Sequence, residues 1–115
     1  MSASIRSRGF ERPRESAPIF AALGDETRLQ LISRLCNEGP MSITRLADGT
    51  NVTRQAIRKH LEVMRRIGLV RNTRRGRERI WQLEQRRLKE ARNCLELISK
   101  QWDEALGRLK KFVEE

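Results

Sequence analysis

The sequence is poor in the side chains that metal sites and most enzyme active sites require. Its 115 residues include one histidine and two cysteines. Cys36 and Cys94 lie far apart and belong to no Cys/His cluster, so we expect each to be a buried, reduced thiol. Borderline metals need clustered thiolate or imidazole groups, and catalysis needs grouped carboxylates or a phosphate loop. We therefore expect no metal, no cofactor and no enzymatic activity.

Long apolar runs are also missing. No stretch of about 18 apolar residues is present, so we expect no membrane span. No apolar signal-peptide core follows the start, and the cytoplasm is the expected location. Hydrophobic residues make up 37% of the chain and charged residues 35%, which suits one domain with a modest core.

Negative charge is scarce relative to positive charge. The chain has 25 Lys and Arg against 15 Asp and Glu, giving a net charge of +10 and a pI of about 11.1. Residues 53–79 hold ten basic side chains and only two acids, Glu62 and Glu78. Such a field favours polyanions, nucleic acid before anionic membrane, and the excess of Arg suits phosphate and guanine.

The segment 53–67 predicts an amphipathic helix that binds DNA. Ile57, Leu61 and Met64 recur at helical spacing, whereas the opposite side is basic and amide-bearing. Thr53 is suited to cap this helix, and a short helix capped by Ser42 precedes it. Between them, residues 48–52 form a tight segment in which we expect Asn51 to adopt a left-handed backbone. The pattern is that of a helix-turn-helix, with a small residue, Ala47, where the two helices cross.

Two extended runs follow, residues 69–73 and 77–83. They are joined through Arg74, Arg75 and Gly76, and the glycine supplies the turn. A hairpin directly after a recognition helix is a wing. Its Arg-rich tip is suited to an adjacent minor groove or its phosphates.

The N-terminal part predicts two more helices. Residues 1–15 show no periodicity and are expected to form a mobile basic arm, either touching phosphates or without a role. Ser16 is expected to cap a first helix with Pro18 in its first turn, and Asp25 to cap a second that stops at Gly39. Residues 16–84 are thus the expected DNA-binding domain.

The segment 85–115 predicts one helix of about 45 Å with a continuous heptad stripe. Because a small domain cannot bury such a seam, we expect it to pair with the same helix of a second subunit, helped by the first helix. The alternative is that it folds back on its own domain. The residues expected at the dimer interface are Ile19, Phe20, Leu88, Ala91, Leu95, Ile98, Trp102, Ala105, Leu109 and Phe112.

The combination resembles the ArsR/SmtB winged-helix regulators. The similar segments are LGDETRL at 23–29, TRQAIRKHL at 53–61, IGLV at 67–70 and GRERIWQL at 76–83. The resemblance implies a homodimeric DNA-binding repressor that is mainly α with a small β-hairpin, in the order α-α-α-α-β-β-α. Metal-sensing members place cysteines around the third helix, whereas residues 39–46 here hold no Cys, His or acid. His60 is expected to be structural, half-buried and hydrogen-bonded.

The expected partner is double-stranded DNA carrying a palindromic operator, and the effector is unknown. Base edges are assigned to Thr53, Arg54, Gln55 and Arg58, phosphates to Lys59, Arg65 and Arg66, and the wing contact to Arg74, Arg75 and Arg77. One alternative is an architectural protein that binds nucleic acid without sequence preference. Another is a redox-responsive or small-molecule-responsive regulator on the same scaffold, in which Cys94 pairs across a dimer.

Overall fold

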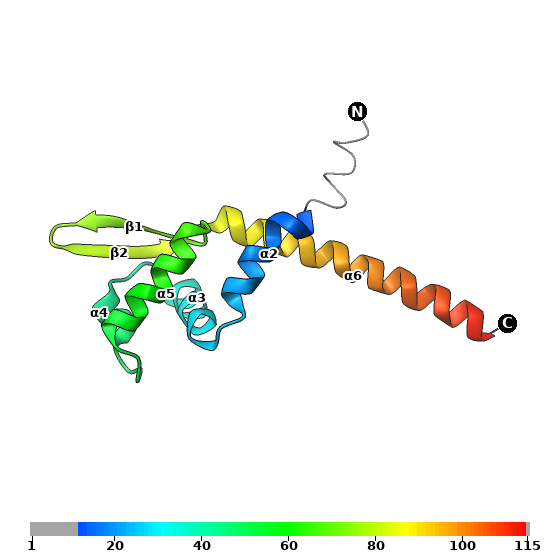
Figure 1. The fold of residues 1–115 in the computed structure, drawn as a ribbon, viewed down its shortest axis with the longest axis horizontal. Coiled ribbons are helices and arrows are strands. Elements are labelled where there is room, and N and C mark those ends of the chain that lie inside the picture. Colours follow the sequence, from blue (N-terminus) through cyan, green and yellow to red (C-terminus); the bar gives the residue numbers. More distant parts are fainter. Residues whose placement is uncertain (1–11, 115) are drawn as a thin grey trace, which may run out of the picture.

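The computed structural model describes residues 12–114, with helices packed around a core and a two-stranded hairpin at one end (Figure 1). The order is α-α-α-α-β-β-α, as expected for a winged helix-turn-helix. The elements are α2 (Arg12–Leu23), α3 (Glu26–Glu38), α4 (Ile43–Ala47), α5 (Arg54–Arg66), β1 (Val70–Arg75), β2 (Glu78–Leu83) and α6 (Gln85–Glu114).

The first described helix begins earlier than expected. Ser16 does not cap it: α2 starts at Arg12, and Ser16 lies inside the helix with only 2% of its surface exposed. Pro18 is likewise in the helix interior. Of the expected basic arm, residues 12–15 are therefore helical, and residues 1–11 lie outside the described part of the chain.

The caps of the next helices follow local sequence rules. The Asp25 carboxylate accepts a hydrogen bond from the Arg28 backbone N–H at 3.0 Å, as an N-cap does. At the other end, Gly39 has a φ of 86° and its N–H donates to the Leu35 carbonyl. The expected limits of α3 are confirmed.

The core is formed by one apolar face from each helix together with the base of the hairpin. It is centred on fully buried side chains from α2, α4 and α5, among them Ile19, Leu46, Ile57 and Leu61. Ile19 was expected at a dimer interface. Because it is completely buried within its own protomer, its side chain is not accessible to a partner, and the same correction applies to Ala91, at 5% exposed.

The hairpin is antiparallel, with Val70 opposite Leu83 and Arg75 opposite Glu78. Its connection is the two residues Gly76 and Arg77, shorter than expected, and Gly76 has the positive φ of 65° that a type II′ turn requires at its first position. An isolated bridge attaches β2 to the segment before α4: Met41 and Trp81 exchange two backbone hydrogen bonds of 3.0 and 2.9 Å. The wing is therefore fixed to the helix-turn-helix.

The long helix α6 leaves the body, and the greatest extent of the structure, 66 Å, runs from the wing to the far end of this helix (Figure 1). Its first turns pack against α2, where Ala91 and Cys94 are buried. Beyond them, the apolar stripe is not covered by any part of the chain that the structure describes. Its exposed members are Leu95, Ile98, Trp102, Leu106, Leu109, Phe112 and Val113.

The two cysteines differ in environment. Cys94 is buried, with 1% of its surface exposed, whereas Cys36 is exposed, contrary to expectation. Because Cys94 is enclosed by its own chain, it is not accessible for a disulfide across a dimer. Residue 36 is near the end of α3, where the helix turns its polar side to solvent.

Candidate nucleic-acid interface

Helix α5 presents its polar face to solvent from its first residue. The Thr53 hydroxyl caps it by accepting from the Ala56 N–H at 3.1 Å, and Ile57, Leu61 and Met64 hold the opposite face in the core. No acid lies in its first turn, and Arg54 occupies that turn, where a cation opposes the helix dipole. A charge in this position does not serve helix stability, which suggests a role in binding an external group.

All the expected contact residues lie on the exposed surface. Those on α5 are Thr53, Arg54, Gln55, Arg58, Lys59, Arg65 and Arg66, and those on the wing are Arg74, Arg75 and Arg77. The wing brings in one residue that sequence reasoning did not select, Arg79. It stands directly opposite Arg74 in the hairpin. Like charges facing each other across strands are destabilising, so this pair also suits an anionic partner. Strand alternation together with the turn position would have revealed it.

A groove separates α5 from the wing. It has a volume of about 930 Å³ and is lined by residues of α4, α5 and both strands, including Thr44, Arg58, Asn72, Arg77 and Arg79. The Arg79 guanidinium donates to the Asn72 side chain at 2.8 Å. Arginines therefore line the groove on both sides, Arg58 and Arg65 from α5 and Arg77 and Arg79 from the wing, and Asn72 adds an amide on the wing side.

Three acids also line the groove, Glu62, Glu78 and Glu84, and Glu62 is the one on α5. The Glu62 carboxylate accepts from the Arg65 guanidinium over distances of 2.9–3.2 Å. This pairing holds the pKa of Glu62 below its usual value and raises the pKa of Arg65. Arg65 is therefore engaged by its own helix and must share its guanidinium with any phosphate.

The turn of the helix-turn-helix is shaped by Gly49 and not by Asn51. Gly49 has a φ of 76°, and no described residue other than glycine has a positive φ. Next to it, Thr50 donates from its backbone N–H and its hydroxyl to the Ala47 carbonyl, at 3.1 and 2.8 Å. The expectation failed because both residue types tolerate this backbone, and glycine has no Cβ to oppose it.

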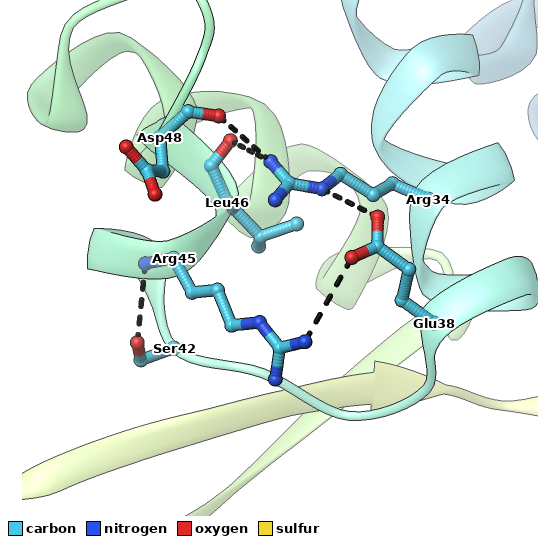
Figure 2. Close-up of polar contacts among 6 residues, drawn as sticks. All are labelled: Arg34, Glu38, Ser42, Arg45, Leu46 and Asp48. Atoms are coloured by element: carbon cyan, nitrogen blue, oxygen red, sulfur yellow. Dashed lines mark hydrogen bonds and ion pairs between the residues drawn. The ribbon is translucent and has the colours of Figure 1, made fainter.

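Arg34 of α3 stabilises the end of α4 (Figure 2). Its guanidinium donates to the backbone carbonyls of Leu46 and Asp48, at 2.9 and 3.1 Å, and is held by Glu38 at 2.8 Å. Helix ends leave such carbonyls without partners, so Arg34 satisfies two groups that the tight turn would otherwise leave free. Sequence reasoning missed this residue because its partners lie 12 and 14 positions away.

Arg28 performs a similar task between three helices. It donates from Nε to the Ala22 carbonyl at 2.7 Å, and Nη1 lies 3.3 Å from His60 Nδ1 on α5. His60 is half-buried and hydrogen-bonded, as predicted. The Arg28 backbone N–H also holds the pKa of Asp25 below its ordinary value.

Helix α5 ends in a Schellman motif. Leu69 N–H donates to the Met64 carbonyl at 2.9 Å and Gly68 N–H to the Arg65 carbonyl at 3.0 Å, with a φ of 78° at Gly68. A further carbonyl at this end, that of Ile67, accepts from Arg87 Nε of α6 at 2.9 Å. Both ends of the helix are thus fixed.

The described chain, residues 12–114, contains no group of three or more His, Cys, Asp or Glu side chains placed to hold a metal ion. In the same range, no helix combines the length and the apolar character needed to cross a membrane.

These features define a winged helix-turn-helix DNA-binding protein. A family model described as a helix-turn-helix domain matches residues 23–73. The transcriptional regulator Rv2034 of Mycobacterium tuberculosis is 34% identical over 95 residues, which cover 83% of this chain and 85% of that protein. An ArsR-like transcriptional regulator from Rhodococcus sp. RHA1 has a similar structure, with a TM-score of 0.73 and 36% identity over 86% of this chain and 92% of that one.

The chain belongs to the ArsR/SmtB-type family of winged helix-turn-helix transcriptional regulators. A possible transcriptional regulator for arsenical resistance is a further structural relative, with a TM-score of 0.63 and 30% identity over 79% of this chain and 91% of that one. These relatives are regulators and not enzymes, in agreement with the expectation from the sequence.

Proposed function

We propose that the protein is a homodimeric transcriptional repressor that binds a palindromic operator in double-stranded DNA and blocks transcription sterically. The observation that carries the proposal is the exposed basic and amide face of α5 beside an equally basic wing. An α-helix of this kind fits the major groove, while a wing of the same charge reaches the flanking backbone. As a regulator of transcription, the protein acts where the chromosome lies, and we assign it to the cytoplasm.

The position of each residue on α5 or on the wing indicates which part of the DNA it contacts. Thr53, Arg54, Gln55 and Arg58 lie in the first turns of α5 and are assigned to base edges, because recognition helices enter the groove by their N-terminal residues. Lys59, Arg65 and Arg66 are assigned to phosphates. Arg74, Arg75, Arg77 and Arg79 of the wing are assigned to the neighbouring backbone or minor groove.

The second subunit is assigned to the exposed stripe of α6. Trp102 is 66% exposed and Phe112 78%, and large apolar side chains recur along the same stripe from Leu95 onward. A contiguous apolar stripe at heptad spacing is a coiled-coil seam, and a second copy offers the same stripe in return. Phe20 of α2 and Leu88 of α6 are partly buried against the core, and we assign their exposed parts to the same interface.

Selection of bound fragments from random DNA tests the function. We expect enrichment of an inverted repeat whose half-sites lie about one helical turn, roughly 34 Å, apart. Single half-sites would contradict the dimer, and binding without enrichment would favour the architectural alternative.

A further inference from the structure

Arg87 connects helices α5 and α6 at the C-terminal end of α5. Arg87 extends from the first turn of α6, and its Nε donates to the carbonyl of Ile67, the C-cap residue of α5, at 2.9 Å. Its Nη1 is held by Glu90 at 2.7 Å, so the guanidinium is fixed from its own helix. The side chain is only 25% exposed.

The surroundings of Arg87 are built to receive it. A Cβ at Gly68 would lie 3.1 Å from Arg87 Cγ, closer than ordinary packing allows. The glycine therefore serves the left-handed backbone of the Schellman motif and also leaves room for the arginine stem. Nearby, the Glu84 N–H donates to the Leu69 carbonyl at 2.8 Å, which extends the hairpin pairing by one residue pair beyond Val70 and Leu83.

The charge is also correctly placed. The carboxyl end of a helix carries partial negative charge on its unsatisfied carbonyls, and a guanidinium stabilises it. Because the contact is a charge-assisted hydrogen bond between two rigid elements, it fixes the direction of α5 relative to α6 more tightly than a sliding apolar contact would.

We infer that Arg87 is a positioning residue for DNA recognition, which transmits the geometry of the α6 helices to the recognition helices. This role rests on the proposed function. The exposed seam of α6 begins at Leu95, about two helical turns after Arg87, so the angle set by the paired α6 helices reaches α5 through this bond. The bond thereby limits the half-site spacings that one dimer accepts.

The test compares Arg87→Met with Arg92→Met. Methionine keeps the apolar stem of the side chain and removes the donor. Arg92 is the matched control, since it lies on the same helix in an ion pair with Glu96 at 3.2 Å but is 78% exposed and bonds to no other element. Arg87→Lys, which keeps a donor and a charge, should restore part of the function.

The first measurement needs no DNA. In Arg87→Met, amide hydrogen exchange at Gly68 and Leu69 should be severalfold faster than in the wild type or in Arg92→Met, because the end of α5 frays without its last cap. Unchanged exchange at these two amides would overturn the inference.

The second measurement uses the selected operator and variants with one base pair added or removed between the half-sites. The preference of Arg87→Met for the correct spacing should fall by a factor of about 3–10, with partial recovery in Arg87→Lys. An undiminished preference would overturn the role of Arg87 alone. A wild-type protein without any spacing preference would overturn the proposed dimeric function and this role with it.

Discussion

Arg54 lies in the first turn of α5, where a cation opposes the helix dipole and no acid compensates it. Its replacement by alanine should therefore leave the helix intact while removing a base contact. We expect discrimination between the operator and random DNA to fall by about 1–3 kcal/mol. Titration of both DNAs measures this. Lys59→Met is the control, because loss of a phosphate contact weakens binding to the operator and to random DNA equally. If Arg54→Ala also weakened binding to both DNAs equally, the assignment of Arg54 to base contacts would be refuted.

Asp25 gives a prediction for stability against pH. Its folded pKa is lowered, chiefly by the Arg28 backbone N–H, so its contribution is present above the unfolded value of about 3.8 and is lost as pH falls through the folded value. Asp25→Asn keeps an N-cap acceptor but does not titrate. As the pH is lowered from 6 to 2, the thermal unfolding temperature should fall less steeply for this variant than for the wild type. Identical pH profiles would show that the carboxylate contributes nothing.

Local sequence rules predict contacts only between residues that are close in the sequence. They located the caps Asp25, Ser42 and Thr53, each of which bonds to an N–H three positions later. They failed where two residues satisfy the same rule, as with Gly49 and Asn51. They could not identify Arg34 or Arg87, because their carbonyl partners come close only after the chain has folded.

The basic residues of the wing lie at and beside a connection of only two residues, Gly76 and Arg77. Arg75 faces Glu78 across the hairpin, whereas Arg77 occupies the turn itself. Replacing Arg75 and Arg77 together with methionine should reduce the slope of log affinity against log salt by roughly 0.9 for each lost phosphate contact. Binding titrations at several salt concentrations measure it. An unchanged slope would remove the wing from the interface, and Arg92→Met should leave the slope as in the wild type.

The hairpin also shows what element-level patterns can and cannot give. Alternating apolar residues correctly placed two strands, but the turn was expected one to two residues too early and too long. The turn depends on Gly76 at its first position, and the attachment of the wing depends on the bridge between Met41 and Trp81, which pairs residues 40 positions apart. No local pattern contains that second contact. It decides where the basic tip lies relative to α5.

For the whole molecule, the uncovered stripe of α6 predicts dimerisation. Trp102→Asp places a charge in the seam at a residue that is 66% exposed in the single chain, so the protomer should fold normally. We expect monomers in sedimentation and weak operator binding. Lys100→Asp is the control, since Lys100 is exposed and lies on the side of α6 away from the heptad stripe. Intact dimers in Trp102→Asp would exclude this interface.

The architecture as a whole was predictable because its signals are periodic: helical spacing in α5, alternation in the wing and a heptad stripe in α6. The fraction of each apolar stripe that is buried within its own chain was not predictable. The α6 stripe is covered by α2 only as far as Cys94, which is why Ala91 belongs to the core of the protomer and Leu95 does not. No periodic pattern in the sequence marks that boundary.

The exposed apolar stripe of α6 affects how operator occupancy depends on the concentration of the protein. If operator binding requires two chains joined along this helix, dilute protein is mostly monomeric and the concentration of the binding species rises with the square of the protein concentration. Occupancy of the operator then changes more steeply than the amount of protein does. A cell could relieve repression by a modest fall in synthesis or a modest rise in proteolysis, without any ligand.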